Sequence, residues 1–115
     1  MMIGQCRFGV MAIGDKIYRS DLIVYPDGRV ADNWWRASGH RLTLADIREV
    51  LAADPDVIVA GTGIYGLMRV ASEVRSLLEE RGIELVALRT KSAAKEFNRL
   101  KESPKSVAGC FHLTC

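Results

Sequence analysis

The sequence predicts a single α/β domain with a mixed β-sheet, and three observations support this. First, 115 residues, 49% hydrophobic and 26% charged, suit one hydrophobic core. Second, the first third of the chain reads as short strands separated by turn residues. Third, the remainder alternates between apolar runs typical of buried strands and segments with helical spacing of apolar residues. No repeat or linker divides the chain, so we assign residues 1–115 to one domain.

The N-terminal third predicts an antiparallel meander. Two strands over residues 6–13 and 16–25 flank a Gly-Asp pair at residues 14–15, which is typical of tight turns. A Pro-Asp-Gly turn at residues 26–28 leads into a third strand over residues 30–35. We expect these three strands to pair as neighbours.

The rest of the chain predicts a helix followed by a β-α-β-α-β unit. Thr43 can cap the first helix, which runs through residue 53, with Asp46 three residues on as an imperfect capping box. The parallel strands should be joined by right-handed crossovers. The later elements are a buried strand over 57–60, a helix that follows the glycines of 61–66 and includes Leu67 and Val70, a strand over 83–88, a helix from Thr90 or Ser92 to 102, and a strand over 106–113.

Composition excludes several classes of protein. The net charge of +2 and the lack of a Lys/Arg run give no electrostatic case for nucleic-acid binding. No apolar stretch approaches the ~20 residues that a membrane span needs. Residues 1–10 show no signal or transit peptide, and three cysteines are too few for a disulfide framework. We therefore expect a cytoplasmic protein.

The strongest local motif is GTGIYG at residues 61–66, which fits G-x-G-x-x-G after a buried strand. Its glycines let the backbone approach a ligand, and a following helix would attract an anion. A dinucleotide is disfavoured, because the next strand ends at Arg89 without an acidic residue and no second β-α-β-α-β half fits. Two interpretations stay open: the glycines serve tight packing, or an anion binds Gly61, Thr62, Gly63, Arg89 and Thr90.

A second candidate is a polar cluster of Arg36, His40 and His112. Arg36 and His40 could bind an oxyanion or supply a general base, or they could simply hold their loop through backbone hydrogen bonds. His112 lies between Cys110 and the last residue, Cys115, which are zinc-ligand types, but a structural site normally needs four ligands. The sequence also lacks the G-x-S-x-G motif that carries the nucleophilic serine of many hydrolases. We assign no catalytic residue, metal or cofactor.

The adjacent Trp34 and Trp35 are the candidate interaction residues. Neighbouring residues of a strand face opposite sides, so one indole should enter the core and the other should be exposed enough to bind a partner.

Several separated motifs occur in an order that resembles the MTH938-like family, a domain of unknown function. The resemblance covers nearly the whole chain. Its members include the mitochondrial respiratory complex I assembly factor 3 and the adipogenesis-associated Mth938 domain-containing protein. The motifs are Phe8-Gly9, Ile17-Tyr18, Ser20-Asp21-Leu22-Ile23, Pro26-Asp27-Gly28, Val30, Trp35-Arg36, Gly39-His40, Gly61-Thr62-Gly63, Gly66, Thr90, Ala94, Phe97-Asn98, Leu100 and His112-Leu113-Thr114-Cys115.

The resemblance implies a three-layer α/β fold with a central mixed sheet, and no established enzymatic activity. Two function hypotheses follow. The first is a protein-interaction or assembly module with an unidentified protein partner, and self-association stays open. The second is a small-molecule or anion site, binding or catalytic, where the residues of 61–66 meet Arg36, His40 and Arg89 at the carboxyl ends of the parallel strands. We favour the first; a deep pocket at those strand ends would favour the second.

Overall fold

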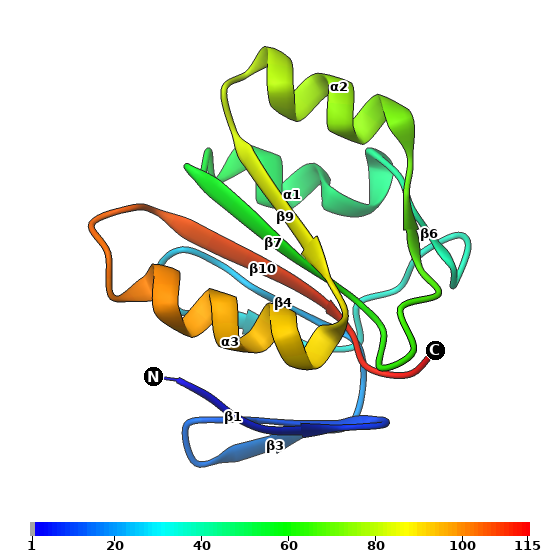
Figure 1. The fold of residues 1–115 in the computed structure, drawn as a ribbon, viewed down its shortest axis with the longest axis vertical. Helices are drawn as coiled ribbons and strands as arrows, with labels where there is room; N and C mark the ends of the chain where they lie inside the picture. Colours follow the sequence, from blue (N-terminus) through cyan, green and yellow to red (C-terminus); the bar gives the residue numbers. More distant parts are fainter. Residues whose placement is uncertain (1) are drawn as a thin grey trace.

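The computed structural model describes residues 2–115 and has a five-stranded mixed sheet at its centre (Figure 1). The strand order is β5-β4-β10-β7-β9, with β7 parallel to both β10 and β9 and with β4 antiparallel to both β10 and β5. The predicted mixed sheet is therefore confirmed. The strands are β4 (Leu22–Val24), β5 (Val30–Ala31), β7 (Val57–Thr62), β9 (Glu84–Leu88) and β10 (Val107–His112).

Two layers cover the faces of this sheet, so the fold has three layers (Figure 1). Helices α1 and α2 cover one face, while α3 and a separate three-stranded antiparallel sheet cover the other. These elements are β1 (Ile3–Arg7), β2 (Val10–Ile13), β3 (Lys16–Tyr18), α1 (Arg48–Ala52), α2 (Ser72–Glu80) and α3 (Thr90–Lys101).

The alternation along β7 explains why its sequence is apolar without a break. Val57 and Val59 pack on the side of α3, whereas Ile58 and Ala60 pack on the side of α1 and α2. A strand covered on both faces has no solvent side, so every position is apolar. The buried strand predicted at residues 57–60 is confirmed, and it continues to Thr62.

Three predicted strands at the N-terminus were wrong in their extent. Residues 6–13 contain the turn between β1 and β2, because Gly9 adopts a φ of 76° and its N–H donates to the Leu113 carbonyl. Residues 16–25 are not one strand: β3 belongs to the outer sheet and β4 to the central sheet. The third strand, predicted over 30–35, is limited to the two residues of β5.

The helix predicted directly after the glycines begins later, at Ser72. Residues 69–70 instead form β8 (Arg69–Val70), which pairs in parallel with β6 (Arg41–Leu42). The Met68 and Arg69 N–H groups donate to the carbonyls of Thr62 and His40, which keeps this segment extended. The first helix also differs, because a 3₁₀ turn, η1 (Ala45–Ile47), precedes the short α1.

Gly109 in β10 provides a test of how tightly the layer of α3 packs on the sheet. A Cβ at this position would lie 2.4 Å from Phe111 Cε2 and 3.0 Å from Phe97 Cδ1. The two rings already pack edge to face with centroids 5.8 Å apart. We expect Gly109→Ala to lower the free energy of unfolding by about 1–3 kcal/mol, because overpacking a core displaces side chains and backbone. Urea denaturation followed by circular dichroism measures this change.

Gly4→Ala in β1 is the matched control. Its Cβ would lie 3.8 Å from Ala12 Cβ, which is ordinary van der Waals contact. We expect a change within about 0.5 kcal/mol for this variant. Equal losses for the two variants would contradict the packing explanation.

Candidate functional site

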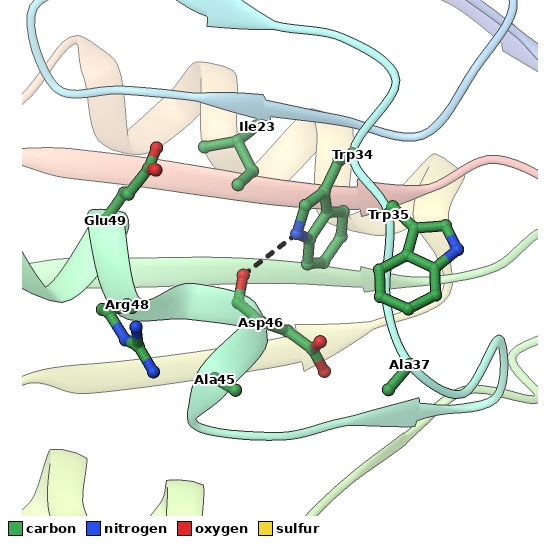
Figure 2. A pocket seen from close by; sticks show the side chains of 8 residues that line it. All are labelled: Ile23, Trp34, Trp35, Ala37, Ala45, Asp46, Arg48 and Glu49. Atoms are coloured by element: carbon green, nitrogen blue, oxygen red, sulfur yellow. Dashed lines mark hydrogen bonds between the residues drawn. The ribbon is translucent and has the colours of Figure 1, made fainter.

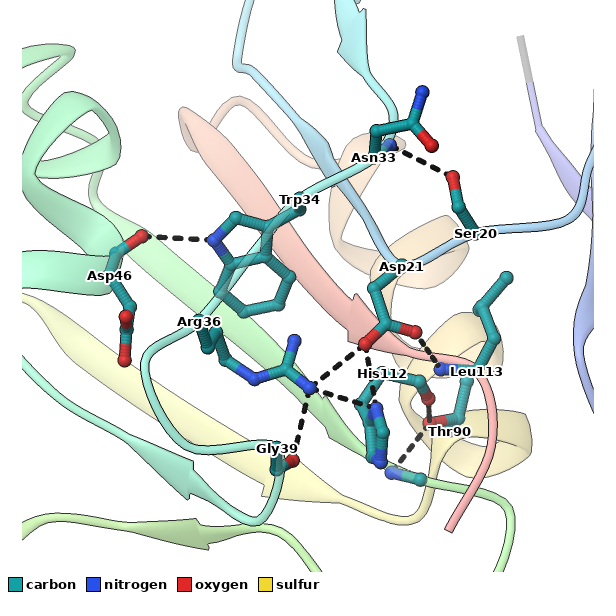
Figure 3. Close-up of polar contacts among 11 residues, drawn as sticks. Ser20, Asp21, Asn33, Trp34, Arg36, Gly39, Asp46, Thr90, His112 and Leu113 are labelled. Carbon is teal, nitrogen blue, oxygen red and sulfur yellow. Dashed lines mark hydrogen bonds and ion pairs between the residues drawn. The ribbon is translucent and has the colours of Figure 1, made fainter.

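Three polar side chains from distant parts of the chain meet at the C-terminal end of β10 (Figure 3). Asp21 Oδ2 lies 2.7 Å from His112 Nδ1 and accepts a hydrogen bond of 2.9 Å from Arg36 Nη2. The other carboxylate oxygen, Oδ1, accepts the Leu113 N–H at 2.7 Å. We call Asp21, Arg36 and His112 the Asp21 cluster. It ties the segment before β4, the loop after β5 and the end of β10 to one another.

The electrostatics of the cluster favour an ionised Asp21. Burial alone would raise the pKa of this carboxyl, but hydrogen bonds from His112, the Leu113 N–H and Arg36 outweigh burial and lower the pKa below its ordinary value. The Arg36 side chain is almost fully buried against this carboxylate. Its charge is therefore neutralised within the protein and is not presented to solvent.

Arg36 also connects the cluster to Trp34. Its guanidinium carbon lies 4.6 Å from the Trp34 ring centroid, a cation–π distance, and Nη2 donates to the Gly39 carbonyl at 3.0 Å. Trp34 is fixed at its other end as well, because its indole Nε1 donates to the Asp46 carbonyl at 3.0 Å. The loop that carries both tryptophans is thus held at several points.

Beside this loop the surface is hollowed over about 370 Å³ (Figure 2). Trp34 is half-buried and packs against the core, whereas Trp35 is 79% exposed. The expectation of one buried and one exposed indole matches this arrangement, although neither residue lies in a strand. We call the lining of this hollow the tryptophan surface; it consists of Ile23, Trp34, Trp35, Ala37, Ala45, Asp46, Arg48 and Glu49.

The glycine motif at residues 61–66 forms hydrogen bonds and close packing contacts with other parts of the chain. The Gly63 N–H donates to Thr90 Oγ1 at 2.9 Å, and that hydroxyl donates to the His112 carbonyl at 2.6 Å. The N–H groups of Ile64, Gly66 and Leu67 donate to backbone carbonyls. Gly63 has a φ of 107°, and a Cβ there would lie 2.3 Å from the Cys115 carbonyl carbon. These contacts support the packing interpretation of the motif.

The structure brings the predicted polar cluster together, and it places the residues of the predicted anion site in packing contacts and hydrogen bonds within the chain. Arg36 and His112 are in direct contact, and the exposed His40 ring lies edge-on to His112 with centroids 6.3 Å apart. Arg89 packs beside Gly66, where a Cβ would lie 3.0 Å from Arg89 Cγ. Gly61 is packed equally tightly, since a Cβ added there would lie 2.9 Å from Thr90 Oγ1. The Thr62 hydroxyl donates a hydrogen bond to the Leu88 carbonyl.

Asp21 is the central residue that motif reasoning did not assign to the site. It lies 91 residues before His112, so no local spacing links the two. Burial raises the pKa of the Cys110 thiol to about 12 despite the charge of Arg36, so this thiol stays protonated at neutral pH. Residues 2–115 also contain no group of three His, Cys, Asp or Glu side chains placed to hold a metal ion.

Comparison with known proteins places the chain in a family. The model of a protein family of unknown function, DUF498/DUF598, matches residues 3–112. The chain belongs to this family. The resemblance to the MTH938-like family is confirmed as well, since the solved structure of MT938 is similar over 99% of this chain and 98% of that one, with 26% identity and a TM-score of 0.83.

Two further solved structures are similar over nearly their whole length. The conserved hypothetical protein PH1505 from Pyrococcus horikoshii is 31% identical over 100% of both chains, with a TM-score of 0.88. A protein of Bartonella henselae described as an outer membrane protein is 28% identical over 98% of this chain and 94% of that one, with a TM-score of 0.80. In the present chain, no helix within residues 2–115 has the length and apolar character needed to span a bilayer.

The Asp21 cluster predicts an acid-sensitive stability. Because the folded-state pKa of Asp21 is lowered, its contribution is fully present above the unfolded-state value near 3.8 and is lost as the pH falls through the folded-state value. Asp21→Asn should destabilise the protein by about 2–3 kcal/mol at pH 7, since it leaves Arg36 buried without its counter-charge. It should also flatten the dependence of stability on pH below about 4. Urea denaturation between pH 3 and 7 measures both effects.

Asp15→Asn is the control for this series. Asp15 is exposed in the turn between β2 and β3. We expect this variant to stay within about 0.5 kcal/mol of the parent and to keep its pH dependence. A pH profile of Asp21→Asn identical to that of the parent would contradict the assignment to Asp21.

Proposed function

We propose that this chain is a protein-interaction module that docks a partner protein on the tryptophan surface. The observation that carries the proposal is the 79% exposure of Trp35 beside a hollow with a largely apolar lining. An indole has a large apolar area, and tryptophan is among the residues most enriched in interface hot spots. Such a side chain becomes more stable when a partner covers it.

The surface is already held in shape before any partner binds. Trp34 is fixed between the Asp46 carbonyl and the guanidinium of Arg36, which the half-buried Asp21 carboxylate holds in turn. The Trp34 N–H donates to the Asp21 carbonyl at 2.9 Å. Because little of the loop has to be ordered on binding, more of the contact energy contributes to affinity.

The shape and lining of the hollow indicate which side chains of the partner bind there. Ile23, Ala37 and Ala45 join the two indoles in lining a space of about 370 Å³, which suits large apolar side chains. Arg48 and Glu49 supply one charge of each sign, as is common at the polar rim of an interface. The occupant is therefore a segment of a different protein with a bulky apolar residue at its centre.

The family supports an assembly role for this interaction, because the MTH938-like proteins include the mitochondrial respiratory complex I assembly factor 3. The three cysteines of this chain are free, which suits a reducing compartment such as the cytoplasm. The alternative function, an anion site at residues 61–66 with Arg36, His40 and Arg89, has less support. The N–H groups of Gly63, Ile64 and Gly66 in that turn donate within the chain, and Arg36 is paired with Asp21.

Site-specific cross-linking followed by a binding measurement tests the proposal. A photoreactive phenylalanine analogue at position 35 should cross-link to a partner protein in cells of the source organism, and the purified partner should bind the parent chain. Trp35→Ala should weaken that binding by about 30-fold or more, as expected for a hot-spot residue. Isothermal titration calorimetry measures the affinities, and thermal unfolding confirms that the variant is folded.

Tyr65→Ala is the matched control, because it also removes an exposed aromatic ring, one that packs beside Phe8. We expect its affinity for the partner to stay within about twofold of the parent. Equal binding by the parent and Trp35→Ala would contradict the proposal. A cross-link between two copies of this chain would instead identify the surface as a homodimer interface.

A further inference from the structure

The small parallel sheet of β6 and β8 places two like charges side by side. Arg41 and Arg69 occupy directly paired positions, and both side chains are exposed. Their neighbours Leu42 and Val70 form the next pair, and both pack against the core. Side chains at paired positions project from the same face, and like charges there repel each other. This arrangement is unfavourable unless something negative lies against it.

Within residues 2–115, no carboxylate forms an ion pair with either Arg41 or Arg69, and the acidic residue nearest in the chain to the hollow is Glu73, in the first turn of α2. Among the exposed arginines of the same range, Arg29 pairs with Asp27 and Arg99 pairs with Glu96, whereas the others form no ion pair, as is the case for Arg41 and Arg69. The guanidinium groups of β6 and β8 therefore remain available to an external anion.

The two arginines line a hollow of about 340 Å³. Its volume lies within the range of small-molecule sites, about 300–1,000 Å³. The lining combines polar and apolar groups, so a ligand with a charged head and a small organic body would fit. The lining residues are His40, Arg41, Arg69, Val70, Ala71 and Ser72.

The hollow also contains the start of α2. Ala71 is the N-cap residue of this nine-residue helix and gives no side-chain cap. Within residues 2–115, the N–H groups of Ser72 and Glu73 have no acceptor. The Ala71 N–H donates to the Leu42 carbonyl at 2.9 Å, which holds the helix start against β6. The partial positive charge of the helix terminus adds to that of the arginines, and the Glu73 carboxylate in the first turn offsets part of this charge.

We propose that this hollow binds the phosphate group of a small phosphorylated molecule. Two guanidinium groups suit the several oxygens of a phosphate dianion, to which arginine binds in a bidentate manner. The free N–H groups of Ser72 and Glu73 and the imidazole of His40 supply further donors. Val70 and Ala71 provide an apolar wall for the organic part. This site is separate from the tryptophan surface and does not depend on the proposed function.

Titration with inorganic phosphate and with glycerol 3-phosphate, followed by ¹⁵N–¹H NMR at constant ionic strength, tests the proposal. Both probes should move the backbone amide signals of Arg41, Arg69, Ser72 and Glu73 in a saturable way. The organic phosphate should bind more tightly than inorganic phosphate, because it also contacts the apolar wall. Unmoved amides at tens of millimolar of both probes, or equal movement with chloride alone, would overturn it.

Three variants separate a specific site from general attraction to positive charge. Arg69→Gln should weaken glycerol 3-phosphate binding by about tenfold or more, since it removes a charge-assisted contact. Ser72→Pro removes one free N–H at a helix position where proline is well tolerated, so affinity should fall while the fold stays intact. Arg81→Gln, at the far end of α2, removes the same charge and should stay within about twofold. Equal losses for Arg69→Gln and Arg81→Gln, or no loss for Arg69→Gln, would overturn the proposal.

Discussion

The Asp21 carboxylate is the contact on which the arrangement of this site depends. One oxygen accepts the Leu113 N–H, and the other binds both Arg36 and His112. A buried arginine without a counter-charge is strongly unfavourable, so the loop that carries Arg36 must lie where the carboxylate is. The position of the tryptophan surface follows from this requirement, because Trp34 stacks on the same guanidinium.

The sheet explains why such a contact can form at all. β4 and β10 are neighbours in the central sheet, and the antiparallel register places Leu22 opposite Phe111. Asp21, one residue before Leu22, therefore meets His112, one residue after Phe111. The hydroxyl of Thr90 joins the His112 carbonyl to Gly63 on the other side of β10. The end of β10 is thus the point where the polar network and the glycine turn are held together.

The sequence predicted the elements with strong local signals. The buried strand at 57–60 and the helix that starts near Thr90 were recognised because their apolar periodicity reflects the layers that cover them. The turn at Gly9 and the late start of α2 at Ser72 were missed. Both depend on hydrogen bonds to residues distant in the sequence, such as Leu113 and His40, which no local pattern reveals. Arg36 and His112 were predicted to belong to one polar cluster, whereas Asp21 was noted only among the residues of the family motifs, and its contact with them was missed for the same reason.

Unsatisfied groups of this chain occur both in the Asp21 cluster and at the surface. The acid, base and cation that could have formed a reactive site neutralise one another in the Asp21 cluster, and Arg36 and His112 are almost fully buried. Within the cluster, Arg36 Nε and Nη1 and His112 Nε2 are buried without a hydrogen-bond partner. At the surface, the Trp35 indole is exposed and Arg41 and Arg69 occupy paired positions. An apolar side chain in water and two adjacent cations are both stabilised by a ligand that covers them. The two proposed ligands, a partner protein and a phosphate, would each cover one of these two surface features.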